Sequence, residues 1–490
     1  MAIKKGDNRN DRDGSASSHM PAGSYWGART IKAREAAVPL PMHYRERFID
    51  AFLLVKKAAA VANAETGRLE AAICRAICQC CDEILSGQWR DQFLTDVYLL
   101  GGWALNGNIN EVIANRAAET QGGTVGNYSV VHPDKHVNLG QANADVYPTA
   151  VRLALLLSLR ELEPSLLDLE RLLRRKSLEF ERVVKVGRTN LRDSLPVTLG
   201  QEFNAYGATI ERSLRRIKEA SSALHELNIG ATHVGTGLGA EPQYVTAVVA
   251  QLSLLSGLTL RPADDFFRIS QSMADFVEFS GALKVLALEL VKIVNDLRLL
   301  NSGPAGGFGE IKIPFYIGEN HPLMPEHLPE KTAGDLLESV AMVSYQVLAN
   351  DAAVCLCAQS GLLEGNSTLP LIGETMLQSL ELLKHSLNVF NQKCLAGVTA
   401  DTARLRKVLL NSESVSLVLA WQIGEEKAAQ VLNEAQQSGK TIEDIVLERK
   451  LMSKEAFEKS IYLRPLTRPG KIPQATAPVA PQVVARAEHP

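Results

Sequence analysis

The sequence predicts a mainly α-helical protein whose core is a bundle of long helices. Apolar residues recur at steps of three and four over long stretches, whereas the alternating pattern of strands is scarce. In the segment 268–300, Leu286, Leu290 and Val294 share one face of a helix, and Ala287 widens that face. An apolar face this wide needs cover on more than one side, which predicts a helix bundle completed by tetramerisation.

Composition and charge exclude several classes of protein. The 46% hydrophobic and 22% charged content is that of an ordinary globular chain, and 490 residues can bury a large core. A net charge of -3 gives no reason to expect nucleic acid or a membrane surface as a partner. No apolar run reaches the roughly 18 residues that span a bilayer, and the polar N-terminus lacks the apolar segment of a secretory signal.

The cysteines give no sign of a metal site. There are seven, and their spacing is not that of metal ligands. Cys78, Cys80 and Cys81 fall on a predicted helix, where small buried thiols are expected. We therefore expect a reducing, cytoplasmic location, with no metal and no other cofactor.

The chain is expected to begin with a disordered tail, residues 1–20, because this stretch is rich in Asp, Asn, Arg and Ser. Residues 21–146 are expected to form an N-terminal helical domain. Within residues 44–86, apolar side chains such as Phe48 and Phe52 recur at helical steps.

Residues 147–397 are predicted to form a central helix-bundle domain. Ser165 follows Glu163 and Pro164, and its hydroxyl can cap exposed backbone N–H groups, so a helix is expected to begin there. Further long helices are expected over 198–226, 268–300, 333–362 and 370–396.

Residues 398–463 are predicted to form a small C-terminal helical domain, because the long helical patterns give way to short ones. Thr441 and Ser453 are each followed by acidic residues, which is typical of a helix start. Residues 464–490 contain Pro, Ala and Val but few aromatic residues, which predicts a flexible tail.

A glycine-rich break follows the segment 268–300. Residues 295–298 read Asn-Asp-Leu-Arg, residues 302–307 read Ser-Gly-Pro-Ala-Gly-Gly, and residues 309–314 read Gly-Glu-Ile-Lys-Ile-Pro. Glycine permits backbone conformations that are closed to other residues, and proline fixes turns. A helix interrupted in this way is a usual place for a flexible catalytic element.

These residues resemble the aspartase/fumarase superfamily, and within it the aspartate ammonia-lyases, which read NDLRLLSSGPRAG, then NEI and LP, at this point. The resemblance covers roughly Pro21 to Ile461. It implies the three-domain fold of the superfamily, a homotetramer, and active sites that each combine segments from three subunits. A small carboxylate or amino-acid-like molecule is implied as the substrate.

The first of these segments is altered beside a well-matched stretch. From Asn106 to Arg116 the chain is very similar to the family pattern N-x-N-x-NEVIANR. Where the family has Thr-Ser-Thr just before it, this chain has Trp-Ala-Leu, with Trp103 first. An indole adds a large apolar volume and donates from one nitrogen only, so the pocket should hold a dianionic succinate poorly. Trp103 and Asn106 are candidate substrate-binding residues.

The second segment keeps its histidines and loses hydroxyls. Residues 132–138 resemble HPNDHVN, and residues 140–145 resemble G-Q-S-S/T-N-D, with two alanines where the family has a substrate-binding serine and asparagine. Gln141 and Asn143 can still donate and accept hydrogen bonds, which makes them candidate substrate-binding residues. His132 is a further candidate, and a structural role for it in the loop is equally compatible with the sequence.

The third segment, residues 187–193, is similar to the family pattern G-R-T-H-L-Q-D. Thr189 is retained, and Asn190 replaces the histidine that helps to polarise the acid side of the reaction. Asparagine does not titrate near neutral pH and cannot carry a proton. His233 is an extra histidine in a stretch resembling GATAVGTG, either structural or a replacement acid.

The family's signature loop, GSS-x-M-P-x-K-x-N-P, carries the catalytic base, and this chain lacks the part with the serine pair and the lysine. His321 stands where the family has an active-site asparagine. His321 and Lys312 are therefore candidate catalytic residues beside Thr189 and Asn190, and Glu310 is a candidate substrate-binding residue. The alternative is a structural ion pair between Glu310 and Lys312 and a solvated His321.

Three functions are compatible with these residues. The first is a superfamily lyase that eliminates or adds across a C–N or C–O bond with an altered substrate or altered chemistry. The second is a catalytically inactive homologue that acts as a binding or assembly partner. The third is an ordinary aspartate ammonia-lyase. The family reaction needs a base, a carboxylate clamp and a way to neutralise the leaving group, and changes fall on each of these elements.

Overall fold

The computed structural model describes residues 8–13, 16–21, 23–36, 40, 43–99, 102–303, 305–314 and 333–461. Most of these residues are helical, and the strands among them pair only as two-stranded sheets, so the predicted mainly α-helical fold class is confirmed. The chain divides into two compact units. The first contains the described residues of Met1–Asp168, Ile210–Lys292 and Glu338–Val389, and the second those of Leu169–Thr209, Ile293–Leu337 and Phe390–Pro490. The division into N-terminal, central and C-terminal domains stays a prediction.

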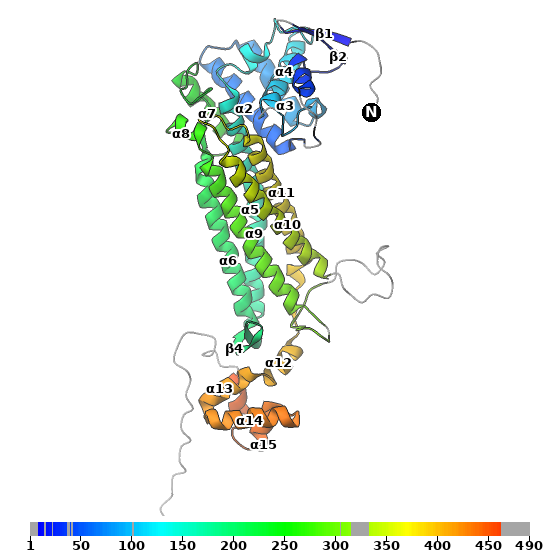
Figure 1. The fold of residues 1–490 in the computed structure, drawn as a ribbon, viewed down its shortest axis with the longest axis vertical. Coiled ribbons are helices and arrows are strands. Elements are labelled where there is room, and N and C mark those ends of the chain that lie inside the picture. The colour runs from blue at the N-terminus through cyan, green and yellow to red at the C-terminus, as the bar shows by residue number, and fades with distance from the viewer. Residues whose placement is uncertain are drawn as a thin grey trace, which may run out of the picture. The chain divides into compact units, whose positions relative to one another are not determined.

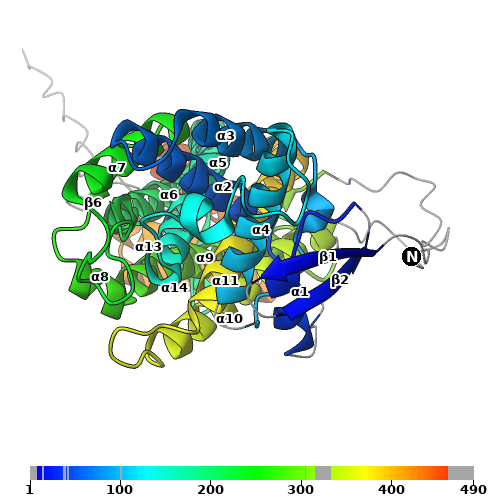
Figure 2. The same ribbon diagram turned by 90° about the horizontal axis from the view of Figure 1, so that it is seen from above.

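The first residues described are strands and not a disordered tail. Strand β1 (Asn8–Asp13) pairs antiparallel with β2 (Ala16–Pro21), and both contact helix α1 (Ala28–Glu35) (Figure 2). Met20 at the end of β2 is fully buried. The expectation of disorder over residues 1–20 is therefore corrected for these strands. The polar composition did not reveal them because a ladder of backbone hydrogen bonds does not depend on side-chain polarity.

Helical periodicity over residues 44–86 is confirmed by helices α2 (Glu46–Glu65) and α3 (Ala71–Leu85), which pack together. The apolar positions that recur in the sequence, such as Phe52, are buried on α2. Helix α4 (Trp103–Thr120) packs against α3 and α1, and helix α7 (Pro242–Ser256) packs against α2. These helices form the end of the first unit that holds the candidate site.

Helix α5 runs without interruption from Asn143 to Glu179. No helix begins at Ser165, so that expectation is wrong. Ser165 is buried, and its hydroxyl donates to Asn388 Oδ1 at 2.8 Å instead of capping a helix end. Leu162 and Leu166 are buried on either side of Pro164, and this packing keeps the helix continuous although proline lacks an N–H donor.

The other long helices match the predicted segments with one break. The segments that belong to the first unit run lengthwise beside α5 (Figures 1 and 2). The segment 268–300 is two helices, because the Ser272 hydroxyl accepts from the backbone N–H of Ala274 at 3.2 Å and starts a new one. The helices are α6 (Leu199–Ser221), α8 (Phe266–Gln271), α9 (Ala274–Leu300), α10 (Ala333–Ala358) and α11 (Leu369–Lys393).

One helical segment, Leu336–Ala358, is long and apolar enough to cross a membrane by length and composition alone, with a mean hydropathy of 1.4 and 44% of its window buried. This corrects the expectation that no segment would reach that length. Asp351 lies inside it and accepts hydrogen bonds from Ser280 (2.8 Å) and Lys284 (2.6 Å) on α9. Because this buried acid is bonded to the neighbouring helix, the segment is a bundle helix.

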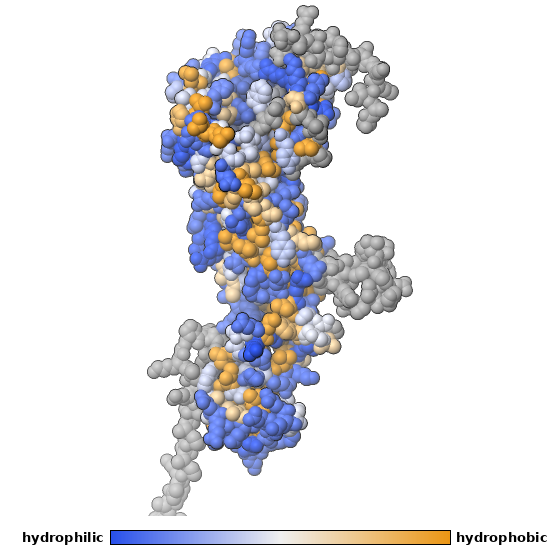
Figure 3. Space-filling model, in the orientation of Figure 1, coloured by the Kyte–Doolittle hydropathy of each residue, from blue (hydrophilic) through white to orange (hydrophobic). Residues whose placement is uncertain are grey.

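Apolar side chains gather on the surface of the long helices (Figure 3). On α10, Met342 is 61% exposed, Tyr345 52% and Leu356 64%, and Leu288 on α9 is 52% exposed. Exposed apolar surface of this kind is typical of a region that contacts another protein. The cover of the bundle by other subunits stays a prediction.

The second unit contains two short antiparallel sheets. Strands β3 (Val184–Thr189) and β4 (Arg192–Thr198) form a hairpin, and β7 (Ile311–Lys312) pairs with β8 (Thr399–Ala400). The hairpin gave no clear sequence signal because its register shifts between Val186 and Arg188, which interrupts the alternation of buried and exposed side chains.

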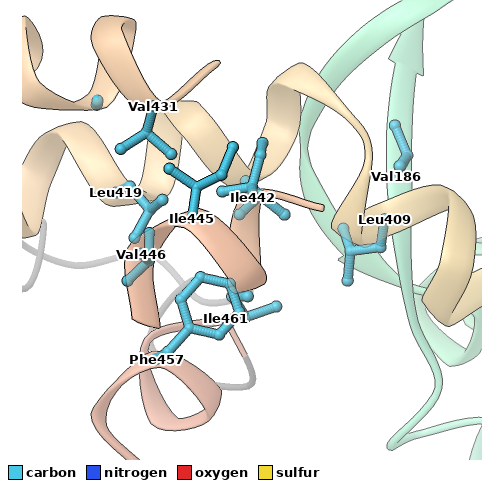
Figure 4. Close-up of a cluster of buried hydrophobic side chains, with 11 residues drawn as sticks. Val186, Leu409, Leu419, Val431, Ile442, Ile445, Val446, Phe457 and Ile461 are labelled. Carbon is cyan, nitrogen blue, oxygen red and sulfur yellow. The ribbon is translucent and has the colours of Figure 1, made fainter. Parts of the chain in front are cut away.

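Short helices complete the second unit around an apolar cluster. Leu419, Val431 and Ile445 lie in this cluster, as Figure 4 shows. Thr441 caps its helix in a capping box with Asp444, and the Ser453 hydroxyl accepts from the backbone N–H of Ala456 at 3.1 Å, so both predicted helix starts are confirmed. The helices are α12 (Thr402–Leu410), α13 (Glu413–Ile423), α14 (Glu425–Ser438), α15 (Ile442–Glu448) and α16 (Lys454–Ile461).

Candidate functional site

Trp103 is the first residue of α4, and its side chain is 68% exposed. The preceding Gly102 has φ +81°, and a Cβ there would come within 2.3 Å of the Tyr147 ring. Only glycine meets both conditions without strain. Gly102 therefore fixes where α4 begins and where the indole stands.

Helix α1 is held against α4 by one buried carboxylate. Glu111 of α4 accepts hydrogen bonds from the backbone N–H groups of Gly27 (2.8 Å), Arg29 (2.8 Å) and Thr30 (3.1 Å), and from the Thr30 hydroxyl (2.7 Å). It thus caps a helix whose own N-cap is a glycine. Burial raises the pKa of Glu111, while these hydrogen bonds lower it.

A pocket of about 650 Å³ opens between α1, α4 and the loops that precede α5 and α7; we call it the first pocket. Four predicted substrate-binding residues, Trp103, Asn106, Gln141 and Asn143, line it together. Arg29 and Asp134 form a two-pronged ion pair within the lining, with 2.6 Å for each contact. The complete lining is Arg29, Lys32, Ala33, Trp103, Ala104, Asn106, Gly107, Asn110, Asp134, Asn138, Gln141, Ala142, Asn143 and His233.

Two asparagines on one face of α4 supply unused acceptors to this pocket. Asn106 and Asn110 are one helical turn apart and are 5% and 2% exposed. Within the part of the chain that the structure describes, neither Oδ1 atom has a hydrogen-bond partner. Buried acceptors left unpaired cost free energy, so a ligand or water that donates to them is favoured here.

Two amides that line the first pocket accept hydrogen bonds from a buried lysine. The Lys56 ammonium donates to Asn138 Oδ1 at 2.7 Å and to Gln141 Oε1 at 3.0 Å. The Gln141 amide in turn donates to the carbonyl of Val137 at 3.0 Å. Burial lowers the pKa of Lys56 to about 7, although the Asp145 carboxylate raises it. Lys56 thereby fixes the orientation of two lining amides.

Asp145 joins the start of α5 to the loop before α7. Its carboxylate accepts from the backbone N–H groups of Ala142 (2.8 Å), Gly230 (3.2 Å) and Thr232 (3.0 Å). Burial raises the pKa of Asp145 to about 7, and the three hydrogen bonds and Lys56 oppose this. These hydrogen bonds hold the loop so that His233, which follows Thr232, lines the first pocket.

His132 has a structural task in the described chain. Its Nδ1 accepts from the backbone N–H groups of Asp134 (3.0 Å) and Lys135 (3.3 Å), which caps the short helix Pro133–Val137. The ring of His136 accepts from the backbone N–H of His132 at 3.0 Å. Burial lowers the pKa of His136, and His132 lowers it further. A substrate-binding role for His132 stays a prediction.

In the second unit, Glu310 is 1% exposed and lies between two cations. Its carboxylate is 2.7 Å from Lys185 Nζ and 2.6 Å from Arg188 Nη2. Lys185 also donates to both carboxylate oxygens of Glu202 at 2.9 Å. The expected alternative, an ion pair between Glu310 and Lys312, is not what the structure contains, because Lys312 pairs with Asp401 at 3.2 Å.

The remaining predicted site residues of the second unit are exposed. Thr189 and Asn190 lie at the tip of the β3–β4 hairpin, where Asn190 and Leu191 have φ +50° and +61°. The side chain of Lys312 is 72% exposed. His321 lies outside the described residues. The structure thus brings together Trp103, Asn106, Gln141 and Asn143, and leaves the catalytic roles of the others as predictions.

Comparison with known proteins identifies the family. A profile described as "Lyase" matches residues 17–348, and a profile for the fumarase C C-terminus matches residues 418–468. Together they cover most of both units. The chain belongs to the aspartase/fumarase superfamily of lyases.

Relatives of this lyase match it over nearly the whole chain. An aspartate ammonia-lyase from Bacillus subtilis is 37% identical over 465 residues, which cover 94% of this chain and 96% of the relative. A class II fumarate hydratase from Thermosynechococcus vestitus is 38% identical over 459 residues, 93% and 97% of the two chains. A solved structure titled fumarate lyase:delta crystallin, from Brucella melitensis and bound to cobalt, superposes with a TM-score of 0.87 at 36% identity and covers 94% of this chain and 100% of that one.

Sequence reasoning missed several residues that build the pocket of this lyase. Asn110 was detectable, because it lies four residues after Asn106 and shares its helix face. Lys56 also carried a signal, since it lies four residues after Phe52 on the apolar face of α2. Asn138 carried no signal for pocket lining, because its position depends on a loop.

Proposed function

We propose that the protein is an elimination/addition lyase, of the C–N or C–O type, that acts on a small carboxylate or amino-acid-like substrate other than L-aspartate. The main observation in support of this proposal is the position of the Trp103 side chain. Its indole lines an open pocket of about 650 Å³ instead of filling it. An inactive site would be expected to be closed by such a residue, whereas a changed specificity needs a changed but open wall.

The lining chemistry supports an altered specificity. The hydroxyls of the family pattern are replaced by apolar groups. Trp103, Ala104 and Ala142 line the pocket, whereas Leu105 is fully buried and is not among the described lining residues. The polar groups left are mainly amides, which donate and accept but do not titrate. Since Asp134 pairs with Arg29, Lys32 is the further cation at the pocket, and it suits a carboxylate end of the substrate.

The reaction needs acid and base groups that the first pocket does not supply in family positions. A base removes a proton from the carbon beside a carboxylate, and the leaving group departs with its electron pair and takes up a proton. We assign these tasks to His321 and Lys312, with Thr189 and Asn190 orienting the substrate. Glu310 would act indirectly, because it pairs with Arg188, the residue of β3 directly before Thr189.

We further infer a cytoplasmic homotetramer, because the bundle surface with Met342, Tyr345 and Leu356 suits cover by other copies of the chain. All seven cysteines are free, as a reducing compartment requires. Solution scattering should give the mass of four chains, and a monodisperse monomer would contradict this.

The function is tested by following fumarate formation in the ultraviolet from a panel of 2-substituted succinates. We expect turnover of a panel member and little or none of L-aspartate or L-malate, because loss of one clamp donor alone costs about 10²–10³ in turnover. Trp103→Thr combined with Leu105→Thr should shift selectivity towards L-aspartate. Robust fumarate formation from L-aspartate by the unmodified protein would overturn the proposal.

The second candidate is deamination of L-aspartate itself. It is favoured by the 37% identity to an aspartate ammonia-lyase over almost the whole chain. The same assay separates the two. Failure to turn over or bind any panel member would instead support the inactive homologue.

A further inference from the structure

Helix α3 carries four of the seven cysteines, and they fall into two pairs. Cys80 and Cys81 are buried, as the sequence predicted, whereas Cys74 and Cys78 are partly exposed. Cys74 and Cys78 are four residues apart, which places them one above the other on the same face of the helix. Neither lines the first pocket. The chain thus presents two neighbouring thiols at a place that the lyase reaction does not use.

The thiols of Cys74 and Cys78 are hydrogen-bonded to each other. The hydrogen bond from Cys78 lowers the pKa of Cys74 to about 7, although partial burial opposes this, and the Arg75 guanidinium lowers it further while the Glu65 carboxylate raises it. The same hydrogen bond, together with burial, raises the pKa of Cys78. Cys74 is therefore the thiolate of the pair and Cys78 is its S–H donor. The thiolate is the nucleophilic form of cysteine.

The other cysteines lack this combination of access and a second thiol. Burial raises the pKa of Cys81 to about 12 and also raises that of Cys80, which keeps both protonated. Cys355 is exposed on α10, but the residues three and four positions away from it are not cysteines. An accessible thiol of low pKa beside a second thiol is the arrangement of cysteines that respond to oxidants.

The first turn of α3 is able to change shape. Its N-cap residue, Glu70, makes no side-chain hydrogen bond to it, and the backbone N–H of Cys74 donates to the Glu70 carbonyl at 3.0 Å. Cβ atoms four residues apart on a helix are about 5–6 Å apart, whereas a disulfide needs roughly 3.5–4.5 Å. A disulfide between Cys74 and Cys78 therefore deforms this uncapped turn. A strained disulfide of this kind is readily reduced again.

We propose that Cys74 and Cys78 form a reversible thiol–disulfide pair that a hydroperoxide oxidises. The Cys74 thiolate attacks the terminal peroxide oxygen, the O–O bond breaks, and the departing oxygen takes up a proton and leaves as water or an alcohol. Cys74 is then a sulfenic acid. The Cys78 sulfur forms the S–S bond with it, and the sulfenic hydroxyl leaves with the Cys78 proton as water. Two electrons pass from the thiols to the hydroperoxide.

Trypsin separates the two cysteines, because it cuts after Arg75. Cys74 falls in the peptide 69–75, and Cys78 falls in the peptide 76–90. The full-length protein is treated with hydrogen peroxide, the remaining thiols are blocked, and the tryptic peptides are analysed by mass spectrometry without reductant. We expect the two peptides to be linked, with a combined mass lower by two hydrogen atoms, and we expect dithiothreitol to separate them.

Two substitutions of Cys78 separate the steps. In Cys78→Ser the hydroxyl still donates to the Cys74 thiolate but forms no disulfide, so Cys74 should remain a sulfenic acid that dimedone traps. Cys78→Ala also removes the donor and should slow formation of the sulfenic acid about 3- to 10-fold relative to Cys78→Ser, because less thiolate is present. Cys355→Ser is the control and should leave the link between the peptides unchanged. Thermal unfolding checks that each variant is folded.

Failure of the unmodified protein to form the linked peptides would overturn the proposal. A link that persists in Cys78→Ser would also overturn it, because Cys80 or Cys81 would then be the partner of Cys74. Equal rates of sulfenic acid formation in Cys78→Ser and Cys78→Ala would refute the activation of Cys74 by Cys78. Each readout is independent of the turnover of succinates, so the lyase reaction is tested separately.

Discussion

The Lys56 ammonium lies 3.0 Å from Gln141 Oε1, so a buried cation on α2 orients an amide in the wall of the first pocket. The same ammonium holds Asn138 at 2.7 Å. Asn138 and Gln141 line the pocket, whereas Lys56 is not among its described lining residues. We therefore expect the affinity for a substrate in this pocket to depend on Lys56, which supports the lining amides.

Lys56→Met should raise KM by about 10-fold with a smaller effect on kcat. The substitution leaves two amide oxygens without a donor, which costs about 1–3 kcal/mol for each unpaired group, while it removes the cost of burying a charge. Steady-state kinetics on whichever succinate the protein turns over, with denaturant unfolding beside it, provides the measurement. Lys57→Met is the control, because Lys57 pairs with Asp82 (2.6 Å) away from the pocket. An unchanged KM in Lys56→Met would refute the positioning role.

Glu310→Gln should lower the free energy of unfolding by about 3–5 kcal/mol, because it removes the carboxylate beside Arg188 and leaves Lys185 with Glu202 alone in a buried place. Lys312→Ala, two residues away, should change it by about 0.5 kcal/mol or less, since that side chain is 72% exposed. Urea unfolding of both variants compares them directly. Equal effects would mean that the buried pairs contribute no more than an exposed one.

The different environments of Glu310 and Lys312 show which features could be predicted from the sequence and which could not. The bundle helices were predictable because their apolar faces repeat with the helical period. The shared pocket of Trp103 and Asn106 was predictable because Asn106 begins a matched motif and Trp103 lies three residues before it. The partners of Glu310 were not, because Lys185 lies on a distant strand and no local pattern encodes that pairing. The predicted helix start at Ser165 was wrong for a similar reason, because the Ser165 hydroxyl bonds Asn388 in the tertiary structure instead of capping a helix.

Glu374 should make stability depend on pH in the neutral range. Burial raises its pKa to about 7, although Arg45 at 2.7 Å opposes the shift. A carboxyl group with a raised folded-state pKa contributes stability that is full below its unfolded value of 4.5 and is lost as the pH rises through about 7. The free energy of unfolding of Glu374→Gln should therefore rise, relative to that of the unmodified protein, by on the order of 2–3 kcal/mol as the pH increases from 4.5 to 8.

Denaturant unfolding at several pH values measures this slope. Glu381→Gln is the control, because Glu381 also pairs with Arg45 but is 48% exposed. The control should keep the slope of the unmodified protein. A Glu374→Gln protein with that same slope would show that another group is responsible.

Leu191→Gly should stabilise the β3–β4 hairpin by about 0.5–1 kcal/mol. Leu191 has φ +61° in a two-residue turn, a left-handed conformation that costs a residue with a Cβ about 1–2 kcal/mol, and part of the gain is offset by the extra freedom of glycine when unfolded. Asn190→Gly should have a smaller effect, because asparagine adopts this conformation more readily. Thermal unfolding of the two variants gives the comparison.

Since Leu191 is 67% exposed in the single chain, a loss of stability in Leu191→Gly that appears only in the assembled protein would mean that the leucine packs against another subunit. The hairpin tip that carries Thr189 and Asn190 would then lie at a subunit interface, as a site shared between subunits requires.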